Sequence, residues 1–325
     1  MPSKRSLVLV LLRRMIITVG LVVAVVFGAT LAWYGPYGVN GLIRNGGGLW
    51  LTVGIDSPRL SPSMRLALHT TQAPTPGGFK WQSVGQGFDV AELPVLLGGS
   101  EVDRILLARI DPARYRFEVR NGSAGDKGLD QWMASLGAAL VVNGSYYGRY
   151  GTPDTPFLSG GVLLGPAHCD AKAGAFVASS TFTGIRDLSH EDWKEAFHGA
   201  DNAMVSYPLL LADGATHVVK PSQWLANRSF IGQDAAGRII IGTTRDAFFS
   251  LDRLARFLLA TPDLGLTIAL NLDGGPVASQ GISLNGYQRR TYGRWEYEAS
   301  GGSGKLLFTP YGTVSMPVVL AVFPK

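Results

Sequence analysis

Asp273 is the residue whose type and position are best suited to chemistry. It follows Asn271-Leu272 and the apolar, β-prone run 266–270, and it precedes Gly274 and Gly275. The run predicts an inner strand, and the two glycines would let a substrate approach the main chain closely. A carboxylate at such a strand end is suited to catalysis, although Asp-Gly pairs also form ordinary hairpin turns. These five positions alone leave both interpretations open.

Other segments carry groups suited to sugars or phosphates. Asn143 follows the predicted strand 138–142, and its amide can bind sugar hydroxyls, while Tyr146 and Tyr147 can pack on a sugar face. Arg228 precedes the predicted strand 229–233, and its planar guanidinium matches a phosphate. The remaining candidates are small residues beside these segments or in a glycine turn, namely Gly144, Gly160, Gly161 and Ser279.

Several common types of site are missing from the sequence. It contains no G-x-S-x-G nucleophile elbow, no H-E-x-x-H zinc motif and no complete phosphate-binding P-loop. The five histidines show no ligand spacing, and the single cysteine, Cys169, excludes an intrachain disulfide and a cysteine zinc cage. The sequence therefore predicts no metal ligand set and requires no cofactor, while leaving a divalent cation open.

The charge balance excludes a nucleic-acid partner. The net charge of +5 comes largely from residues 1–34, which hold four basic and no acidic side chains, and the rest of the chain is nearly neutral. A basic nucleic-acid footprint is thus absent. Only 16% of residues are charged and 42 of 325 are glycine, which favours a strand-rich, turn-rich protein over a helical bundle.

An uncharged stretch, Met15–Tyr34, predicts a transmembrane anchor. Its 20 residues would span about 30 Å as a helix. All nearby basic residues precede it, so the N-terminus is expected in the cytoplasm and the main domain in the periplasm or outside the cell. A signal peptide cleaved near Thr30-Leu31-Ala32 is the alternative. The expected organisation is a basic N-terminus (1–14), an anchor (15–34), a linker (35–80) and one domain (81–325).

The predicted domain is of the α+β class: mixed, strand-rich and single, with a few helices, preceded by the transmembrane helix. Helical spacing appears over Leu129–Leu136, with Gly137 as its C-cap, and over Phe248–Leu259. Two hairpins are indicated around Asp213-Gly214 and around 234–237. Hairpins argue against a purely alternating α/β domain. Further strands are expected at 102–110, 115–119, 306–308 and 314–323.

The order of the motifs is more specific than any one of them. Asn-Gly-x-Tyr-Tyr, Gly-Gly-x-x-x-Gly, Tyr-Pro-Leu-Leu-Leu-Ala-Asp-Gly, Asn-Arg-Ser-x-Ile-Gly-x-Asp and Asn-Leu-Asp-Gly-Gly occur in that sequence. Over about residues 100–322 the chain resembles the phosphodiester glycosidase family. It departs from the family pattern at Ser145–Tyr147, at Ser229-Phe230, and at Pro276–Ala278, which stand before Ser279.

This resemblance implies a membrane-anchored hydrolase that cleaves the C1–O bond of a sugar-1-phosphodiester in an envelope or exported glycan. It implies that Asp273 stabilises or attacks the anomeric centre, that Arg228 clamps phosphate and that Asn143 orients the sugar. Asp154 is either a second carboxylate or part of a plain loop. Substrate contacts are expected from Gly144, Tyr146, Tyr147, Gly160, Gly161, Asn271, Gly274, Gly275 and Ser279.

The alternative is a non-catalytic glycan-binding or envelope-assembly module on the same fold. It would use Tyr146, Tyr147 and Trp295 as a carbohydrate platform. In both interpretations the partners are a carbohydrate and, through the N-terminal helix, a membrane, with no nucleic acid.

Overall fold

The computed structural model of the chain describes residues 4–34, 50–122, 127–148, 150–169, 173–309 and 314–325. They belong to two units, Met1–Leu49 and Trp50–Lys325. The first contains helix α1 (Lys4–Tyr34). Its 19-residue segment Leu11–Ala29 is long and apolar enough to cross a membrane, a property that signal sequences share. The predicted apolar helix is therefore present.

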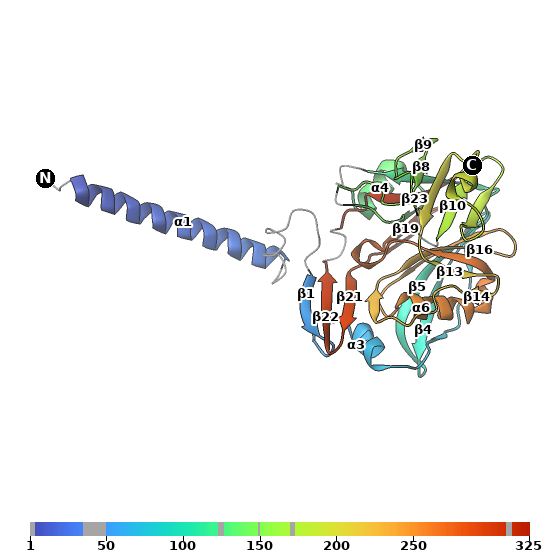
Figure 1. Ribbon diagram of the computed structural model, residues 1–325, viewed down its shortest axis with the longest axis horizontal. Helices are drawn as coiled ribbons and strands as arrows, with labels where there is room; N and C mark the ends of the chain where they lie inside the picture. The colour runs from blue at the N-terminus through green and yellow to red at the C-terminus, as the bar shows by residue number, and fades with distance from the viewer. Residues whose placement is uncertain (1–3, 35–49, 123–126, 149, 170–172, 310–313) are drawn as a thin grey trace. The chain divides into compact units, whose positions relative to one another are not determined.

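The second unit is built around a nine-stranded sheet (Figure 1). Its strands are β2 (Thr75–Pro76), β3 (Gln82–Gly85), β4 (Phe88–Leu97), β5 (Ser100–Ile110), β13 (Leu209–Ala212), β14 (Ala215–Thr216), β16 (Ser229–Asp234), β17 (Ile239–Thr244) and β18 (Leu266–Asn271). They pair in the order β14-β13-β18-β16-β17-β5-β4-β2, and β3 also pairs with β4. The strand leading to Asp273, β18, is an inner strand, as predicted.

Three smaller sheets complete the unit. The first runs β20-β19-β7-β23-β6 and contains β6 (Tyr115–Asn121), β7 (Leu140–Asn143), β19 (Gln280–Leu284), β20 (Tyr287–Thr291) and β23 (Val318–Pro324). The second runs β11-β10-β12-β8-β9 and contains β8 (Phe157–Ser159), β9 (Val162–Leu163), β10 (Gly174–Ala178), β11 (Thr183–Asp187) and β12 (Asn202–Ser206). The third runs β1-β22-β21-β15 and contains β1 (Trp50–Gly54), β15 (Trp224–Ala226), β21 (Trp295–Ser300) and β22 (Ser303–Phe308).

The helices of this unit are short. They are α3 (Pro62–His69), α4 (Leu129–Leu136), α5 (Trp193–Ala196), α6 (Leu251–Leu259) and the 3-10 turns η2 (Pro262–Leu264) and η3 (Gly275–Val277). α4 ends where the sequence predicted, because Gly137 adopts φ +60° and its N–H returns to the Met133 carbonyl. The α+β, strand-rich prediction is confirmed.

The nine-stranded sheet is buried on both faces, which explains its uninterrupted apolar runs. In β5, Leu106 and Ala108 face a core shared with β6, β7 and β23, whereas Ile105 and Leu107 face a second core under α6, α3 and the four-stranded sheet. A strand packed on both sides has no polar face, so its sequence does not alternate. This layering places the ends of three sheets near one another.

The predicted linker, residues 35–80, needs correction over its second part. β1 pairs antiparallel with β22, and Leu60 and Met64 are buried in the second core. The many polar and small residues between 50 and 80 obscured this, because each element is short and buries few side chains. Residues 35–49 lie outside the described part of the chain.

Helix α6 begins three residues later than predicted. The carboxylate of buried Asp103 accepts hydrogen bonds from the main-chain N–H groups of Arg245, Asp246 and Phe248. Ala247 adopts φ +58° within this loop. The segment thus folds around a distant carboxylate before the helix can start, and sequence periodicity does not show that contact.

Replacing Met64 by Ala tests whether residues 50–80 belong to the fold. Met64 is fully buried, so Met64→Ala should lower the free energy of unfolding by about 2–5 kcal/mol. Leu66 in the same helix is 42% exposed, and Leu66→Ala should change stability by about 0.5 kcal/mol or less. Denaturant unfolding of the full chain measures both. Equal, small effects would mean that α3 is not part of the core.

Candidate active site

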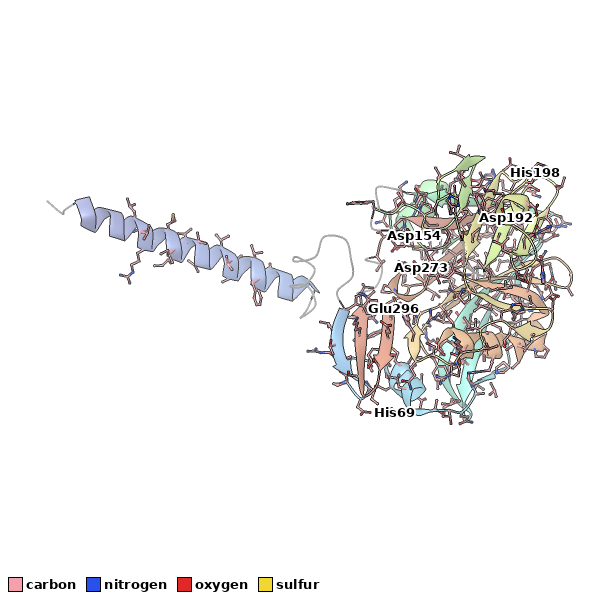
Figure 2. The ribbon with its side chains drawn as sticks, viewed as in Figure 1. His69, Asp154, Asp192, His198, Asp273 and Glu296 are labelled. Carbon is pink, nitrogen blue, oxygen red and sulfur yellow. The ribbon has the colours of Figure 1, made fainter. Side chains whose placement is uncertain are left out.

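Asp273 lies where the ends of three sheets meet. β7 ends at Asn143, β18 ends at Asn271, and β15 and β21 supply Trp224 and Glu296 from the four-stranded sheet. Figure 2 shows Asp154, Asp273 and Glu296 following one another along this region. The negative charges of Glu296 and Asp154 both affect the Asp273 carboxyl, so the three groups are neighbours. The site is assembled from segments that are far apart in the sequence.

Asn143 joins β7 to the Asp273 loop. Its Nδ2 donates to the main-chain oxygen of Asp273 at 2.8 Å, and its Oδ1 accepts from the Ser279 N–H at 3.2 Å. The Asp273 N–H in turn donates to the Gly144 carbonyl at 3.0 Å. Asn143 is only 2% exposed, so its amide fixes the loop and has little surface for a sugar. The structure brings Asn143 and Asp273 together, and Asn143 positions the Asp273 loop through its main-chain hydrogen bonds.

Asn227 holds the opposite wall of the site. Its Nδ2 donates to the carbonyls of Thr244 and Arg245, and its Oδ1 accepts from the N–H groups of Arg294 and Trp295. Its own carbonyl accepts from the Gly275 N–H at 2.9 Å. An Asn amide has two donors and two acceptor positions, and all are used here. Asn227 therefore fixes the start of β21 against the turn that contains Gly275.

Arg228 is buried beside the two carboxyl groups. It is 5% exposed, and its Nε and Nη2 donate to the carbonyls of Phe249 and Trp224 at 3.3 and 2.7 Å. Burial lowers the pKa of the guanidinium, an effect opposed by the negative charge of Glu296 and Asp273. Within the described residues Nη1 makes no hydrogen bond, which leaves one edge of Arg228 for an anion.

Glu296 is a site residue that the sequence did not reveal. The indole N–H of Trp224 donates to its Oε1 at 2.8 Å. Its side chain lies against Gly275, which has φ +72° and where a Cβ would collide with the Glu296 carboxylate. Only glycine satisfies both conditions. Glu296 belongs to an ordinary strand without a motif, and only the pairing of β21 with β15 places it here.

Burial raises the pKa of both carboxyl groups. Burial, then the negative charge of Glu296, raises the pKa of Asp273 to about 8, while the hydrogen bond from the Gly274 N–H and the charge of Arg228 oppose the increase. Burial also raises the pKa of Glu296, and Arg228 and the hydrogen bond from Trp224 oppose it. The two groups are therefore coupled, because a charge on Glu296 disfavours a second negative charge on Asp273.

An aromatic pair borders the carboxyl groups. The rings of Tyr146 and Tyr207 stack with centroids 4.3 Å apart, and Tyr146 Oη donates to the Tyr207 carbonyl at 2.8 Å. Buried Asn271 donates to both the Tyr146 hydroxyl and the Tyr207 carbonyl. Burial, then the charge of Asp273, raises the pKa of Tyr146. Tyr146, Tyr207 and Asn271 thus form one rigid wall, of which Tyr207 was not predicted.

Of the remaining residues predicted for the site, some lie near Asp273 and others have only structural contacts or lie in an exposed turn. Gly274 lies against Arg228, and burial and the charge of Asp273 raise the pKa of half-buried Tyr147. Gly144 packs on Val318, and the Ser279 hydroxyl accepts the Gly293 N–H, so packing and loop structure account for these two. Gly160 and Gly161 form the exposed β8–β9 turn, where both have positive φ. Pro276 and Val277 are buried in η3.

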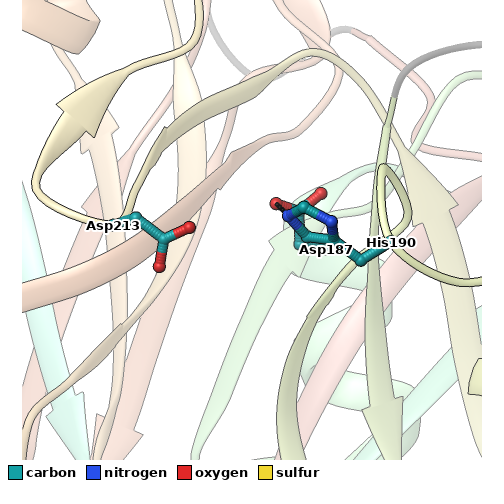
Figure 3. A group of neighbouring side chains, drawn as sticks. All are labelled: Asp187, His190 and Asp213. Atoms are coloured by element: carbon teal, nitrogen blue, oxygen red, sulfur yellow. Dashed lines mark ion pairs between the residues drawn. The ribbon is translucent and has the colours of Figure 1, made fainter.

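Two other features lie outside this site. A cavity of about 650 Å³ is lined by residues of α3, α6 and the segment around the start of β15, and its lining does not include Asp273, Arg228 or Glu296. Asp187, His190 and Asp213 bring one oxygen or nitrogen each within 4.8 Å of one another (Figure 3). Among the described residues this is the group whose donor atoms could hold a metal ion.

Comparison with known families gives one match. Residues 136–295 match the model of the phosphodiester glycosidases. This segment is similar to the phosphodiester glycosidases and spans just under half of the chain. It contains Asn143, Arg228 and Asp273 and ends immediately before Glu296. The match supports a hydrolase of the glycosidase type and agrees with the resemblance seen in the sequence.

Solved structures show the same fold. The catalytic domain of zebrafish N-acetylglucosamine-1-phosphodiester α-N-acetylglucosaminidase, auto-inhibited by its pro-peptide, matches with a TM-score of 0.54 and 16% identity, over 82% of this chain and 95% of that chain. A hypothetical protein from Synechocystis matches with a TM-score of 0.50 and 14% identity, over 77% of this chain and 64% of that chain. A comparison with curated protein sequences gave no match.

The raised pKa of Asp273 predicts a pH-dependent stability. The folded state binds the proton more tightly than an unfolded Asp of pKa 3.8, so wild-type stability should fall as pH rises from about 4 to about 8. Asp273→Asn removes this loss. The variant should be about 1–3 kcal/mol more stable than wild type at pH 9, because partial exposure keeps the difference below 1.4 kcal/mol per pKa unit.

Thermal unfolding of the two full-length proteins from pH 4 to pH 9 measures the effect. The advantage of Asp273→Asn should be smallest near pH 4 and should grow with pH. A difference that is constant over this range would show that Asp273 titrates normally in the folded protein.

Proposed function

We propose that this chain hydrolyses the bond between the anomeric carbon of a sugar and the phosphate oxygen of a sugar-1-phosphodiester, within an envelope or exported glycan. One observation carries the proposal. Two carboxyl groups, Asp273 and Glu296, lie beside buried Arg228 at the junction of three sheets, and the pKa of Asp273 is raised to about 8. A protonated acid, a carboxylate and an anion-binding cation are the groups that this reaction needs.

Asp273 and Arg228 act on the phosphate leaving group. As the C1–O bond breaks, its electrons pass to the phosphate oxygen, and the Asp273 carboxyl donates its proton there. The free edge of Arg228 neutralises part of the phosphate charge. The phosphodiester anion would raise the pKa of Asp273 further when it binds, which keeps the acid protonated at neutral pH. This role replaces the carboxylate role that the sequence suggested for Asp273.

Glu296 acts on the anomeric carbon of the sugar, and Tyr146 and Tyr207 contact the sugar ring. Breaking the C1–O bond gives the sugar oxocarbenium character, which a nearby carboxylate stabilises. Glu296 then accepts a proton from the water that adds to C1. The Trp224 N–H keeps Glu296 ionised by bonding to its charged form. Tyr146 and Tyr207 provide the face on which the sugar packs, and Asn143 holds the Asp273 loop in place.

A non-catalytic glycan-binding module explains the site less well. A binding platform requires exposed aromatic and polar groups, whereas this site holds a carboxyl group in surroundings that raise its pKa to about 8. Perturbed acidity of this kind is typical of catalytic groups. Trp295, the third member of the suggested platform, packs on Phe308 with ring centroids 4.2 Å apart.

Hydrolysis of sugar-1-phosphodiesters by the full chain, purified in detergent, tests the proposal. In water enriched in ¹⁸O the label should appear on the sugar C1 hydroxyl and not in the phosphate, because the C1–O bond is the one that breaks. Asp273→Asn and Glu296→Gln should each lower kcat by about 10²–10⁴-fold. Glu195→Gln, an exposed carboxylate on α5, is the matched control and should keep wild-type activity.

Two results would contradict this reaction. Label in the phosphate would mean that the P–O bond breaks and that the chain is a phosphodiesterase. Turnover close to wild type in Glu296→Gln would remove Glu296 from the chemistry.

We further propose that α1 is an uncleaved anchor with its N-terminus in the cytoplasm and the catalytic domain on the other side. The helix begins at Lys4, its basic residues Arg13 and Arg14 precede most of the apolar segment, and none follows within the helix. A chain with an N-terminal epitope tag should remain at full length in the membrane fraction. Recovery of a shortened, soluble chain that starts near Ala32 would establish a cleaved signal peptide.

A further inference from the structure

We propose that Asp187, His190 and Asp213 form a binding site for a zinc ion, separate from the candidate active site. Asp187 is the last residue of β11, His190 lies in the turn that follows, and Asp213 lies in the hairpin between β13 and β14. Figure 3 shows the Asp213 carboxylate directed across the gap toward Asp187 and His190. One donor atom from each residue lies within 4.8 Å of the other two.

The distances and donor types fit zinc. Zinc binds His nitrogen and Asp oxygen at about 2.0–2.2 Å, so two ligands of one ion lie about 3–4 Å apart. His190 Nε2 and Asp187 Oδ2 are 3.8 Å apart, which is too long for a hydrogen bond and suitable for two ligands of a shared ion. An imidazole with two carboxylates suits zinc better than calcium or magnesium, which take oxygen ligands almost alone.

The state of Asp187 is a second observation that points to a cation. Its Oδ1 accepts hydrogen bonds from the Ser189 N–H and hydroxyl, at 2.8 and 2.7 Å. Its Oδ2 is buried and has no hydrogen-bond partner. Buried acceptors are nearly always paired, and an orphan such as this one indicates a water molecule or an ion. Here the orphan oxygen is the one that faces the imidazole.

Three protein ligands would leave the fourth position of a tetrahedral zinc ion to a water molecule.

The site would join two sheets. β11 is an edge strand of a five-stranded sheet, and the β13–β14 hairpin forms one edge of the nine-stranded sheet. A metal ion shared between them would cross-link edges that are about 25 positions apart in the sequence. Its expected role is structural, since none of its ligands belongs to the Asp273 cluster.

Calorimetric titration of ZnCl₂ into the full chain, stripped of metal with EDTA, tests the inference. We expect one zinc ion per chain, and an increase of about 5 °C in Tm when zinc is about 100-fold above its Kd. Asp213→Asn and His190→Gln should each weaken binding at least about 10-fold. Asp213→Asn is conservative, because Asn tolerates the positive φ of +52° at this turn.

Two exposed residues close to the cluster in the sequence provide matched controls. Asp201→Asn and His198→Gln change an exposed Asp and an exposed His outside the cluster, and they should bind zinc as wild type does. No zinc binding by the wild-type chain, binding unchanged in both cluster variants, or tighter binding of Ca²⁺ than of Zn²⁺ would each overturn the inference. The readout is independent of sugar-phosphate hydrolysis.

Discussion

The buried amide of Asn227 is the interaction on which the site depends. It bonds four main-chain groups, two at the end of β17 and two at the start of β21, and its own carbonyl receives the Gly275 N–H. Segments of two different sheets and the glycine turn are therefore held by one residue. A side chain without this double donor and double acceptor would leave buried main-chain groups unpaired, at a cost of about 1–3 kcal/mol each. Glu296 and the glycine turn owe their proximity to this residue.

Asn143 performs the corresponding task on the other side of Asp273. Its amide binds the Asp273 carbonyl and the Ser279 N–H, so the loop 273–279 is held at both ends by β7. Two asparagines, each bonded to main-chain groups, thus lie on either side of the loop that carries Asp273. Rigid main-chain clamps of this kind hold catalytic groups in place without occupying the surface that a substrate needs.

Placing the site at a sheet junction also sets its electrostatics. The surrounding cores withdraw Asp273, Glu296 and Arg228 from water, which strengthens the interactions among them. Burial raises the pKa of both carboxyl groups, and the negative charge of Glu296 adds to the increase at Asp273. Arg228 opposes the increase at both. The acidity of each group therefore depends on the other members of the cluster.

Individual residues show how far the sequence could determine this protein. Apolar periodicity and turn residues determined most strands, the C-cap of α4 and the inner position of β18, since these depend on residues adjacent in the chain. The ordered motifs also singled out Asn143, Arg228 and Asp273, which the fold brings into one region. Glu296, Trp224 and Tyr207 could not be found in this way, because they lie in ordinary strand or turn sequences and acquire a role only through pairing between distant segments. The same holds for α3, whose few apolar residues are buried only in the core that it shares with α6, and for Asp187, His190 and Asp213. The sequence by itself thus determined most strands and the resemblance to the phosphodiester glycosidases, whereas the tertiary structure decided which groups surround Asp273 and raise its pKa, because burial and distant neighbours are not specified by chain order.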